Sequence, residues 1–159
     1  MRPKPTGHVL GNDLILTRIF RAPIDDVWRS VTQSERTELW FGRWEGDAGP
    51  GKTVRLQLTH EKDQPWSNVL IEECDAPHRL VVAMKDDYGD WRIEVTLTQT
   101  NDTTELRFVQ RLSDRKLAGD VGPGWEYYLD MLVASREGTA LPSFADYYPS
   151  QKAYYLDGA

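Results

Sequence analysis

Apart from one short interval after residue 23, the spacing of apolar residues changes once along this chain, and that change limits what the chain can fold into. Up to residue 112, short segments rich in β-branched and apolar residues are separated by Gly, Pro, Asn and Asp every 8–12 residues. From residue 123 to 137, apolar residues recur at the three- to four-residue spacing of an amphipathic helix. The pattern predicts a meander of hairpins followed by one long helix, with strands at 14–21, 54–60, 68–75, 78–85, 91–99 and 104–112.

Two short helices are expected between the first two of these strands. Pro23 suits the first turn of a helix, and the acidic pair that follows it suits the positive N-terminal end. Apolar residues at three- to four-residue spacing then predict a helix over 24–32, and a second short helix is expected over 34–39. The sequence therefore predicts an α+β protein with a six-stranded antiparallel sheet, two short helices after strand 1 and a long C-terminal helix.

The length of 159 residues is typical of a single domain. Residues 1–13 contain Pro3, Pro5 and Gly7 and are expected to form a flexible N-terminal arm. Gly138 is a suitable stop for the long helix, so the domain is expected to span 14–139. Residues 140–159 are then a C-terminal tail, either packed on the domain through its aromatic residues or disordered.

Charge and composition argue against several kinds of partner, although a local basic patch stays open. The net charge of −6 argues against a surface for nucleic acids or anionic membranes, because both need clustered Lys and Arg. No apolar run is long enough to predict membrane insertion, and the first residues lack the apolar stretch of a signal peptide. Cys74, the single cysteine, cannot form an internal disulfide, which fits a reducing compartment. We expect a cytoplasmic protein.

One short segment carries a misleading motif. Residues 46–53, GDAGPGKT, match the phosphate-binding pattern G-x-x-x-x-G-K-[ST]. A phosphate-binding loop needs a buried strand before it and a helix directly after it. Residues 54–60 instead alternate as a strand, and Pro50 removes one of the backbone donors that phosphate would need. The favoured interpretation is a Gly/Pro turn that leads into a strand.

Four stretches, in order along the chain, resemble successive signatures of one family: FRAPIDDVWRSVTQSERTELWFG, PGKTVRLQL, VLIEECDAPHRLVVAM and GPGWEYYLDML. They look like those of the AHSA1-like proteins (activator of Hsp90 ATPase homologue 1-like), part of the SRPBCC or START/Bet v 1-like superfamily. The resemblance implies the helix-grip fold, in which a curved antiparallel sheet wraps a long C-terminal helix around an apolar cavity. Relatives of this fold include binders of lipids, hormones and polyketides as well as some enzymes, so the fold by itself does not assign an activity.

An aromatic-rich sequence suits such a cavity, since six Trp, seven Tyr and four Phe are present. The leading hypothesis is a protein that binds an apolar or aromatic small molecule between the sheet and the C-terminal helix. The same side chains could instead simply fill the core. Gln110, on the face shared by Phe108 and Leu112, is a candidate polar contact that orients the ligand. The candidate ligand-binding residues are Trp40, Phe41, Trp44, Leu56, Trp66, Met84, Trp91, Phe108, Gln110, Trp125 and Tyr128.

Two other function classes stay open. An enzyme of the cyclase or hydrolase type, acting on a bulky apolar substrate, would need an acid or base inside the cavity. Glu73, or Glu94 if the strand register differs, is the best candidate and neither is compelling, so the catalytic residues stay unknown and the binding function is favoured. A chaperone-related protein-interaction module would use an exposed apolar patch instead. A homodimer is a further partner that the sequence leaves open.

No cofactor and no metal site are expected. His60, Glu61 and Asp63 form the one local group of a histidine with carboxylates. Their spacing near a strand end makes them converge poorly on one ion, so a solvated loop is the favoured interpretation.

Overall fold

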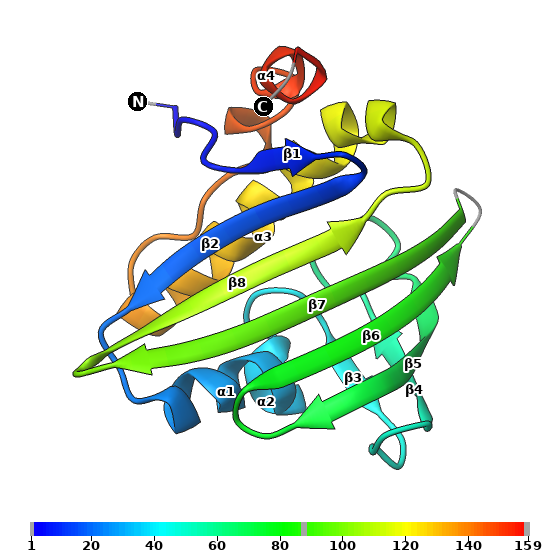
Figure 1. Cartoon of the computed structure of the whole chain (residues 1–159), viewed down its shortest axis with the longest axis vertical. Helices are drawn as coiled ribbons and strands as arrows, with labels where there is room; N and C mark the ends of the chain where they lie inside the picture. The colour runs from blue at the N-terminus through cyan, green and yellow to red at the C-terminus, as the bar shows by residue number, and fades with distance from the viewer. Residues whose placement is uncertain (1, 87–88, 158–159) are drawn as a thin grey trace.

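In the part of the chain that the structure describes, the six segments expected as strands and two further short segments form one antiparallel sheet of eight strands, in the order β1-β2-β8-β7-β6-β5-β4-β3 (Figure 1). This computed structural model describes residues 2–86 and 89–157; Met1, Gly158 and Ala159, which the expected arm and tail included, lie outside that range. The strands are β1 (His8–Leu10), β2 (Asp13–Phe20), β3 (Arg43–Glu45), β4 (Thr53–Gln57), β5 (Trp66–Asp75), β6 (Arg79–Asp86), β7 (Gly89–Thr100) and β8 (Thr103–Arg111).

The expected count of six strands was therefore too low. The two additional strands, β1 and β3, are each three residues long, which is too short for an alternating pattern to be seen. Both lie at the edges of the sheet, where each pairs with one neighbour. β1 lies in the segment that was assigned to the N-terminal arm, and it pairs with β2 through His8 and Ile15 at one end of the register.

The helices follow the expected order. α1 (Ile24–Thr32) has the predicted bounds, and α2 (Ser34–Thr37) ends two residues early. The long helix α3 (Ala118–Glu137) begins five residues before Pro123, because the turn ahead of that proline is also helical. Gly138 ends α3 in the left-handed conformation with φ of 68°, as a C-terminal glycine commonly does. Shorter helices complete the chain: η1 (Arg115–Leu117), η2 (Phe144–Asp146) and α4 (Lys152–Leu156).

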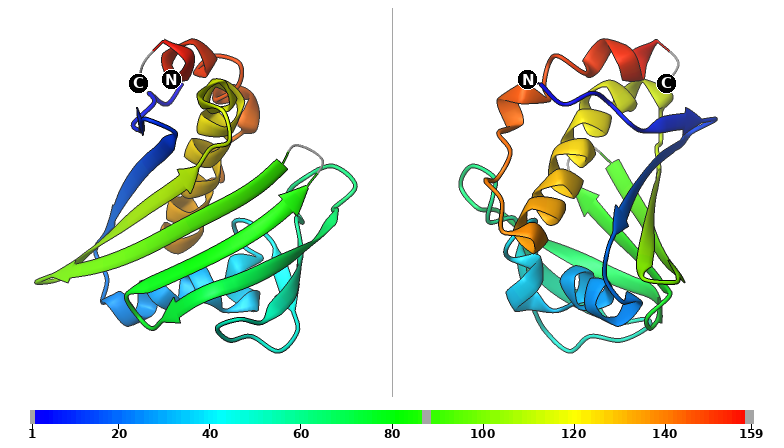
Figure 2. Two further views of the ribbon diagram at one scale, coloured as in Figure 1. Left: turned by 45° about the vertical axis from the view of Figure 1, so that its right-hand side comes forward. Right: turned by 90° about the vertical axis from the view of Figure 1, so that its left-hand side faces the viewer.

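α3 packs across the concave inner face of the sheet, while α1 and α2 close one end (Figures 1 and 2). Alternation decides which strand residues face α3. Leu16 pairs with Phe108, and Phe108 pairs with Val95 on the next strand, so the three side chains share the inner face. Leu129 and Leu132 of α3 meet this face and are almost fully buried. No helix within the described residues is both long and apolar enough to cross a membrane.

The two ends of the chain meet beside the N-terminal half of α3 (Figure 2). Their meeting point is Glu126, which is 1% exposed. Its carboxylate accepts hydrogen bonds from the Tyr155 hydroxyl at 2.6 Å, from Arg18 at 2.9 Å and from Thr6. We call Thr6, Gly7, Arg18, Glu126 and Tyr155 the terminal clasp. Burial by itself raises the pKa of Glu126, but the hydrogen bonds from Thr6, Tyr155 and Arg18 outweigh it and hold the pKa below its usual value.

A second polar link joins α1 to the C-terminal end of α3. The Arg136 guanidinium donates to Asp26 Oδ2 at 2.6 Å and to Ser30 Oγ at 2.7 Å. Arg36 adds a hydrogen bond of 3.2 Å to Asp26 Oδ1. The hydrogen bond from Arg136 is the largest cause that lowers the pKa of Asp26. The ionised form of Asp26 therefore stabilises the contact between α1 and α3.

Replacing Asp26 by asparagine is expected to give a stability loss that depends on pH. The folded-state pKa lies below the unfolded value of about 3.9, so the contribution is fully present above that value and is lost as pH falls through the folded pKa. At neutral pH the loss should be below about 1 kcal/mol, because the carboxylate is partly exposed. Urea unfolding of the wild type and Asp26→Asn at pH 7 and at lower pH measures it.

The matched control is Asp25→Asn. Asp25 is the adjacent, exposed acidic residue of α1, whereas Asp26 forms the salt bridges to Arg29, Arg36 and Arg136. If the difference in unfolding free energy between the wild type and Asp26→Asn stays constant down to acid pH, the stability loss does not come from the ion pair of Asp26.

Candidate ligand-binding cavity

A cavity of about 260 Å³ lies between the inner face of the sheet, the first two helices and α3. Strands β4 to β8 supply most of its wall, α1 and α2 close one side, and α3 contributes Trp125 and Leu129. The lining residues are Val31, Thr32, Thr37, Trp40, Phe41, Trp44, Ala48, Gly49, Val54, Leu56, Val69, Ile71, Cys74, Leu80, Val82, Met84, Ile93, Val95, Leu106, Phe108, Trp125 and Leu129.

Successive side chains of a strand point to opposite faces of the sheet, and this alternation explains why the strands present apolar side chains to the cavity. Val54 and Leu56 point inward from β4, while Arg55 between them is exposed. In β5 the alternation is interrupted, because the register against β6 shifts between Ile71 and Glu73. This irregularity lets Ile71 and Cys74, three residues apart, both line the cavity.

Exposure along the wall separates a deep end from a mouth. Phe108 and Trp125 are 1% and 8% exposed and mark the deep end. Ala48 and Cys74 are exposed and mark the mouth. The cavity therefore opens beside the turn that leads into β4.

That turn is the segment GDAGPGKT. β4 begins at Thr53, so a strand and not a helix follows the glycines, as the sequence predicted. Ala48 and Gly49 of the turn line the cavity, and Lys52 bridges back to Asp47 at 2.6 Å. Gly51 has a φ of 80°, a conformation that favours glycine. The segment thus forms the rim of the cavity mouth.

Aromatic rings pack together at the deep end. Phe41 stacks on Trp125 with ring centroids 5.4 Å apart, and Phe108 lies 4.4 Å from Trp125 on another side. The Trp125 indole N–H donates to Gln110 Oε1 at 2.7 Å, and this bond fixes the plane of the indole ring. A cluster of aromatic rings therefore forms this part of the wall, and its one polar atom, the indole nitrogen of Trp125, already has a hydrogen-bond partner inside the protein.

Seven of the eleven residues proposed from the sequence line the cavity, namely Trp40, Phe41, Trp44, Leu56, Met84, Phe108 and Trp125. Four lie elsewhere. Trp66 is on the outer face, where the guanidinium groups of Arg43 and Arg55 lie 5.0 and 4.5 Å from its ring centroid. Trp91 and Gln110 border a small separate space beside η1. The amide oxygen of Gln110, proposed to orient a ligand, accepts the indole N–H of Trp125.

Tyr128, the fourth, supports the wall from behind. Its ring packs edge-on against Phe41 at 4.8 Å, and its hydroxyl donates to Glu61 Oε2 at 2.7 Å. Burial, with the nearby Glu61 carboxylate, raises the pKa of Tyr128.

His60 Nε2 lies 2.8 Å from the Glu38 carbonyl oxygen. His60 and Glu61 thus connect the β4–β5 loop to the end of α2 and to α3, respectively. Within residues 2–86 and 89–157, no three His, Cys, Asp or Glu side chains converge as metal ligands would.

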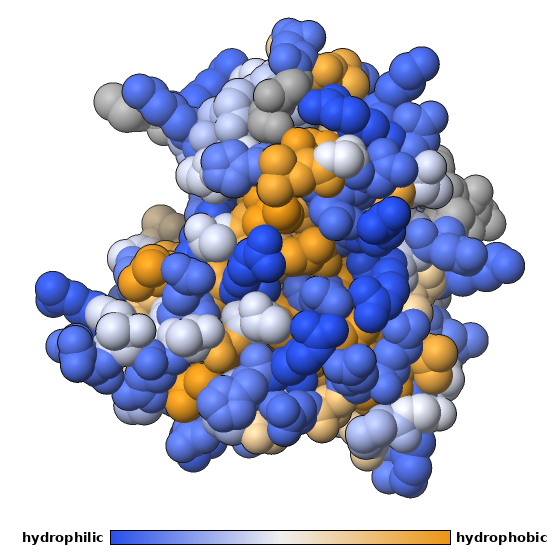
Figure 3. Space-filling model, in the orientation of Figure 1, coloured by the Kyte–Doolittle hydropathy of each residue, from blue (hydrophilic) through white to orange (hydrophobic). Residues whose placement is uncertain are grey.

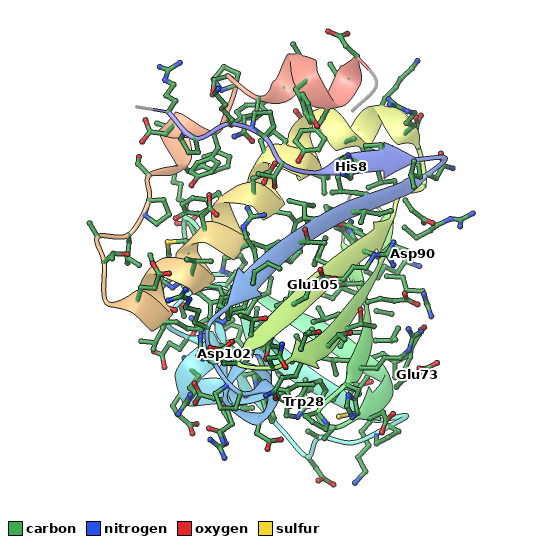
Figure 4. All side chains as sticks on the ribbon, turned by 60° about the vertical axis from the view of Figure 1, so that its left-hand side comes forward. His8, Trp28, Glu73, Asp90, Asp102 and Glu105 are labelled. Carbon is green, nitrogen blue, oxygen red and sulfur yellow. The ribbon has the colours of Figure 1, made fainter. Side chains whose placement is uncertain are left out.

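The two carboxylates considered for catalysis lie on the outer face. Arg79 binds both Glu73 and Glu94 at 2.7 Å, and Arg92 binds Glu94 at 3.2 Å. Glu73 lies on the side of the sheet opposite α3 (Figure 4). The same face carries mostly hydrophilic residues around a central apolar strip (Figure 3). Among the described residues, no carboxylate, imidazole, amine or guanidinium lines the cavity.

Aliphatic and small polar residues of the wall were missed at the sequence level. Choosing by aromatic type overlooked inward-facing aliphatic residues such as Val82, Val95 and Leu106, although alternation placed Val95 and Leu106 on an inward face. No sequence signal indicated Thr32 and Thr37, because their position in the wall depends on how α1 and α2 meet the sheet.

A curved antiparallel sheet that grips a long C-terminal helix, with an apolar cavity between them, defines the helix-grip class of the SRPBCC or START/Bet v 1-like proteins. The sequence profile described as "Activator of Hsp90 ATPase homolog 1-like protein" matches residues 21–136. The chain therefore belongs to the AHSA1-like family, which confirms the resemblance and the fold class inferred from the sequence.

Solved structures with the same fold include proteins of two bacteria. The crystal structure of CalU16 from Micromonospora echinospora has a TM-score of 0.76 at 22% identity, over 97% of this chain and 94% of that one. The protein encoded by BPP1335 of Bordetella parapertussis has a TM-score of 0.75 at 19% identity, over 99% and 92%. DynU16, a protein of the dynemicin biosynthetic locus, has a TM-score of 0.71 at 19% identity, over 88% and 51%. No curated protein matches the sequence significantly.

Proposed function

We propose that this chain is a cytoplasmic binding protein that holds an uncharged, apolar or aromatic small molecule in the cavity. The observation that carries the proposal is the wall itself, in which apolar side chains predominate and no charged side chain occurs among the described residues. Burial of apolar ligand surface contributes about 25 cal/mol per Å² before the costs of association, so such a wall favours binding by desolvation.

The size of the cavity indicates the size of the ligand. A dry apolar cavity of about 150 Å³ accommodates benzene. At about 260 Å³, this cavity is slightly smaller than the usual range for small-molecule sites, which begins at about 300 Å³. A ligand of two fused rings, or of one ring with a short aliphatic chain, fits it.

The family and its structural neighbours support a binding role without naming a ligand. The fold family is known for small-molecule binding, and DynU16 is a protein of the dynemicin biosynthetic locus. The alternative of an enzyme is less favoured, because Glu73 and Glu94, the acids considered for it, lie in ion pairs on the outer face.

Titration with the neutral fluorescent probe 1-aminonaphthalene, which has two fused rings, tests the proposal. We expect saturable binding at one site with a change in tryptophan emission, because Trp40, Trp44 and Trp125 line the cavity. The variant Val95→Phe adds volume inside the cavity and should weaken binding at least about tenfold by filling the space. The readouts are probe fluorescence and the thermal midpoint of unfolding.

The matched control is Ile19→Phe, which adds the same ring on the outer face, where Ile19 is 62% exposed. It should bind the probe like the wild type. If Val95→Phe folds and binds the probe with unchanged affinity, the cavity is not the binding site and the proposal fails.

A further inference from the structure

The polar atoms in the cavity wall are arranged unequally, and this arrangement bears on the chemistry of the ligand. The three tryptophans of the wall carry indole N–H donors, and each donor is already used. Trp40 donates to the Ser30 carbonyl oxygen at 2.8 Å, Trp44 to the Thr32 carbonyl oxygen at 2.8 Å, and Trp125 to Gln110 at 2.7 Å. These rings therefore offer a ligand apolar surface and no free hydrogen-bond donor.

Thr32 and Thr37 are the two lining residues that carry a hydroxyl group, and each hydroxyl already donates its proton within the protein. Thr32 Oγ1 donates to the Trp28 carbonyl oxygen at 2.7 Å, and Thr37 Oγ1 donates to the Ser34 carbonyl oxygen at 3.3 Å. A hydroxyl has one proton to donate and two lone pairs that accept. Both oxygens thus keep the capacity to accept a hydrogen bond after their protons are used.

The remaining hydrogen-bond donors of the wall are weak or exposed to solvent. The Cys74 thiol is a weak donor, and it stands at the exposed mouth. The backbone of Ala48 is also at the mouth, where solvent competes for it. Across the described wall, the side chains of the interior offer acceptors and no uncommitted strong donor.

A wall of this kind discriminates between ligands of equal size. A carboxylate or other anion would lose its water and find no donor, and an uncompensated buried charge is strongly disfavoured. A carbonyl or ether oxygen would also be left without a partner. An alcohol or phenol hydroxyl can donate to an oxygen that still accepts.

We propose that the cavity selects neutral, largely apolar molecules that carry a hydroxyl donor directed at Thr32 and Thr37, and rejects anions of the same shape. This inference rests on the proposed binding function and adds the substrate class to it. Thr32 and Thr37 are then specificity-determining residues, while the aromatic and aliphatic wall supplies most of the affinity.

Three bicyclic probes of similar size test the inference on the wild-type protein by isothermal titration calorimetry at pH 7. 2-Naphthol carries a donor, 2-methoxynaphthalene carries only an acceptor, and 2-naphthoate is an anion at this pH. We expect 2-naphthol to bind about five- to tenfold more tightly than 2-methoxynaphthalene, the size of one net hydrogen bond. 2-Naphthoate should bind at least about 100-fold more weakly than 2-naphthol.

The double variant Thr32→Val and Thr37→Val replaces both hydroxyl groups by methyl groups of nearly the same shape. It should abolish the preference for 2-naphthol and leave the affinity for 2-methoxynaphthalene within about twofold of the wild type. Thr98→Val, at an exposed position of β7, is the matched control and should change none of the three affinities. The wild-type probe comparison decides the question even if the double variant does not fold.

The outcomes separate this inference from the function on which it rests. If 2-methoxynaphthalene or 2-naphthoate binds as tightly as 2-naphthol, the donor selectivity is wrong while the binding function stands. If the double variant folds and keeps the 2-naphthol preference, Thr32 and Thr37 do not determine it and the inference is overturned. If none of the three probes binds, both the binding function and the selectivity are rejected.

Discussion

Replacing Glu126 by alanine is expected to lower the free energy of unfolding by about 3–5 kcal/mol, the cost of removing one partner of a buried ion pair. The carboxylate is 1% exposed and joins the terminal clasp. Without it, the buried Tyr155 hydroxyl and the part-buried Thr6 amide lose their acceptor, and the Gly7 amide keeps only the Tyr155 hydroxyl as a partner. Arg18 keeps Asp130, at 3.0 Å, as its remaining partner.

Urea unfolding measures this loss, and Glu137→Ala at the exposed end of the same helix is the control. The control should change the unfolding free energy by less than about 0.5 kcal/mol. Amide hydrogen exchange should also increase at Thr6 and Gly7 in Glu126→Ala, because the clasp holds the N-terminal segment on α3. A loss no larger than that of Glu137→Ala would show that the clasp does not stabilise the fold.

Two glycines of α3 are expected to respond to alanine in opposite directions. A Cβ added at Gly122 would lie 2.6 Å from the Tyr155 ring, so Gly122→Ala must displace α4 or the helix. We expect it to lower the unfolding free energy by about 1–3 kcal/mol through overpacking. A Cβ at Gly124 meets nothing within 4 Å, and there Gly124→Ala should raise stability by up to about 1 kcal/mol, because alanine is the better helix former.

The two variants are matched, since they lie two residues apart in one helix and make the same chemical change. Thermal and urea unfolding of both, with the wild type, measures the two shifts. If Gly122→Ala were as stable as Gly124→Ala, α4 would not be packed against α3 as the structure has it.

Much of the fold could be predicted from local patterns. Alternation at 91–99 and 104–112 predicted β7 and β8, and the three- to four-residue spacing predicted most of α3. Each of these patterns indicates which side of a helix or strand is buried, and it can be recognised from the residues of that element alone. The strands β1 and β3 escaped because three residues are too few to establish a period, and pairing with β2 and β4 defines them instead.

The site could be predicted only in part. Aromatic residues on inward faces, such as Phe108 and Trp125, were identified from their type and spacing. Trp66 has the same type but points to the opposite side of the sheet, where two arginines cover it. Gln110 faces inward as expected, yet it is satisfied by Trp125. Which polar atom already has a partner is a property of residues distant in sequence.

The sequence by itself determined the order of the longer strands and helices and the face that most of them bury, since these follow from the spacing of neighbouring residues. Four stretches that resemble known signatures indicated the family. Only the tertiary structure decided where the inward faces fail to meet and leave a cavity, because that depends on the curvature of the whole sheet relative to α3. It also decided the surroundings of Glu126. Its partners Thr6 and Arg18 lie 120 and 108 residues away along the chain, and only folding brings their donors to one buried carboxylate.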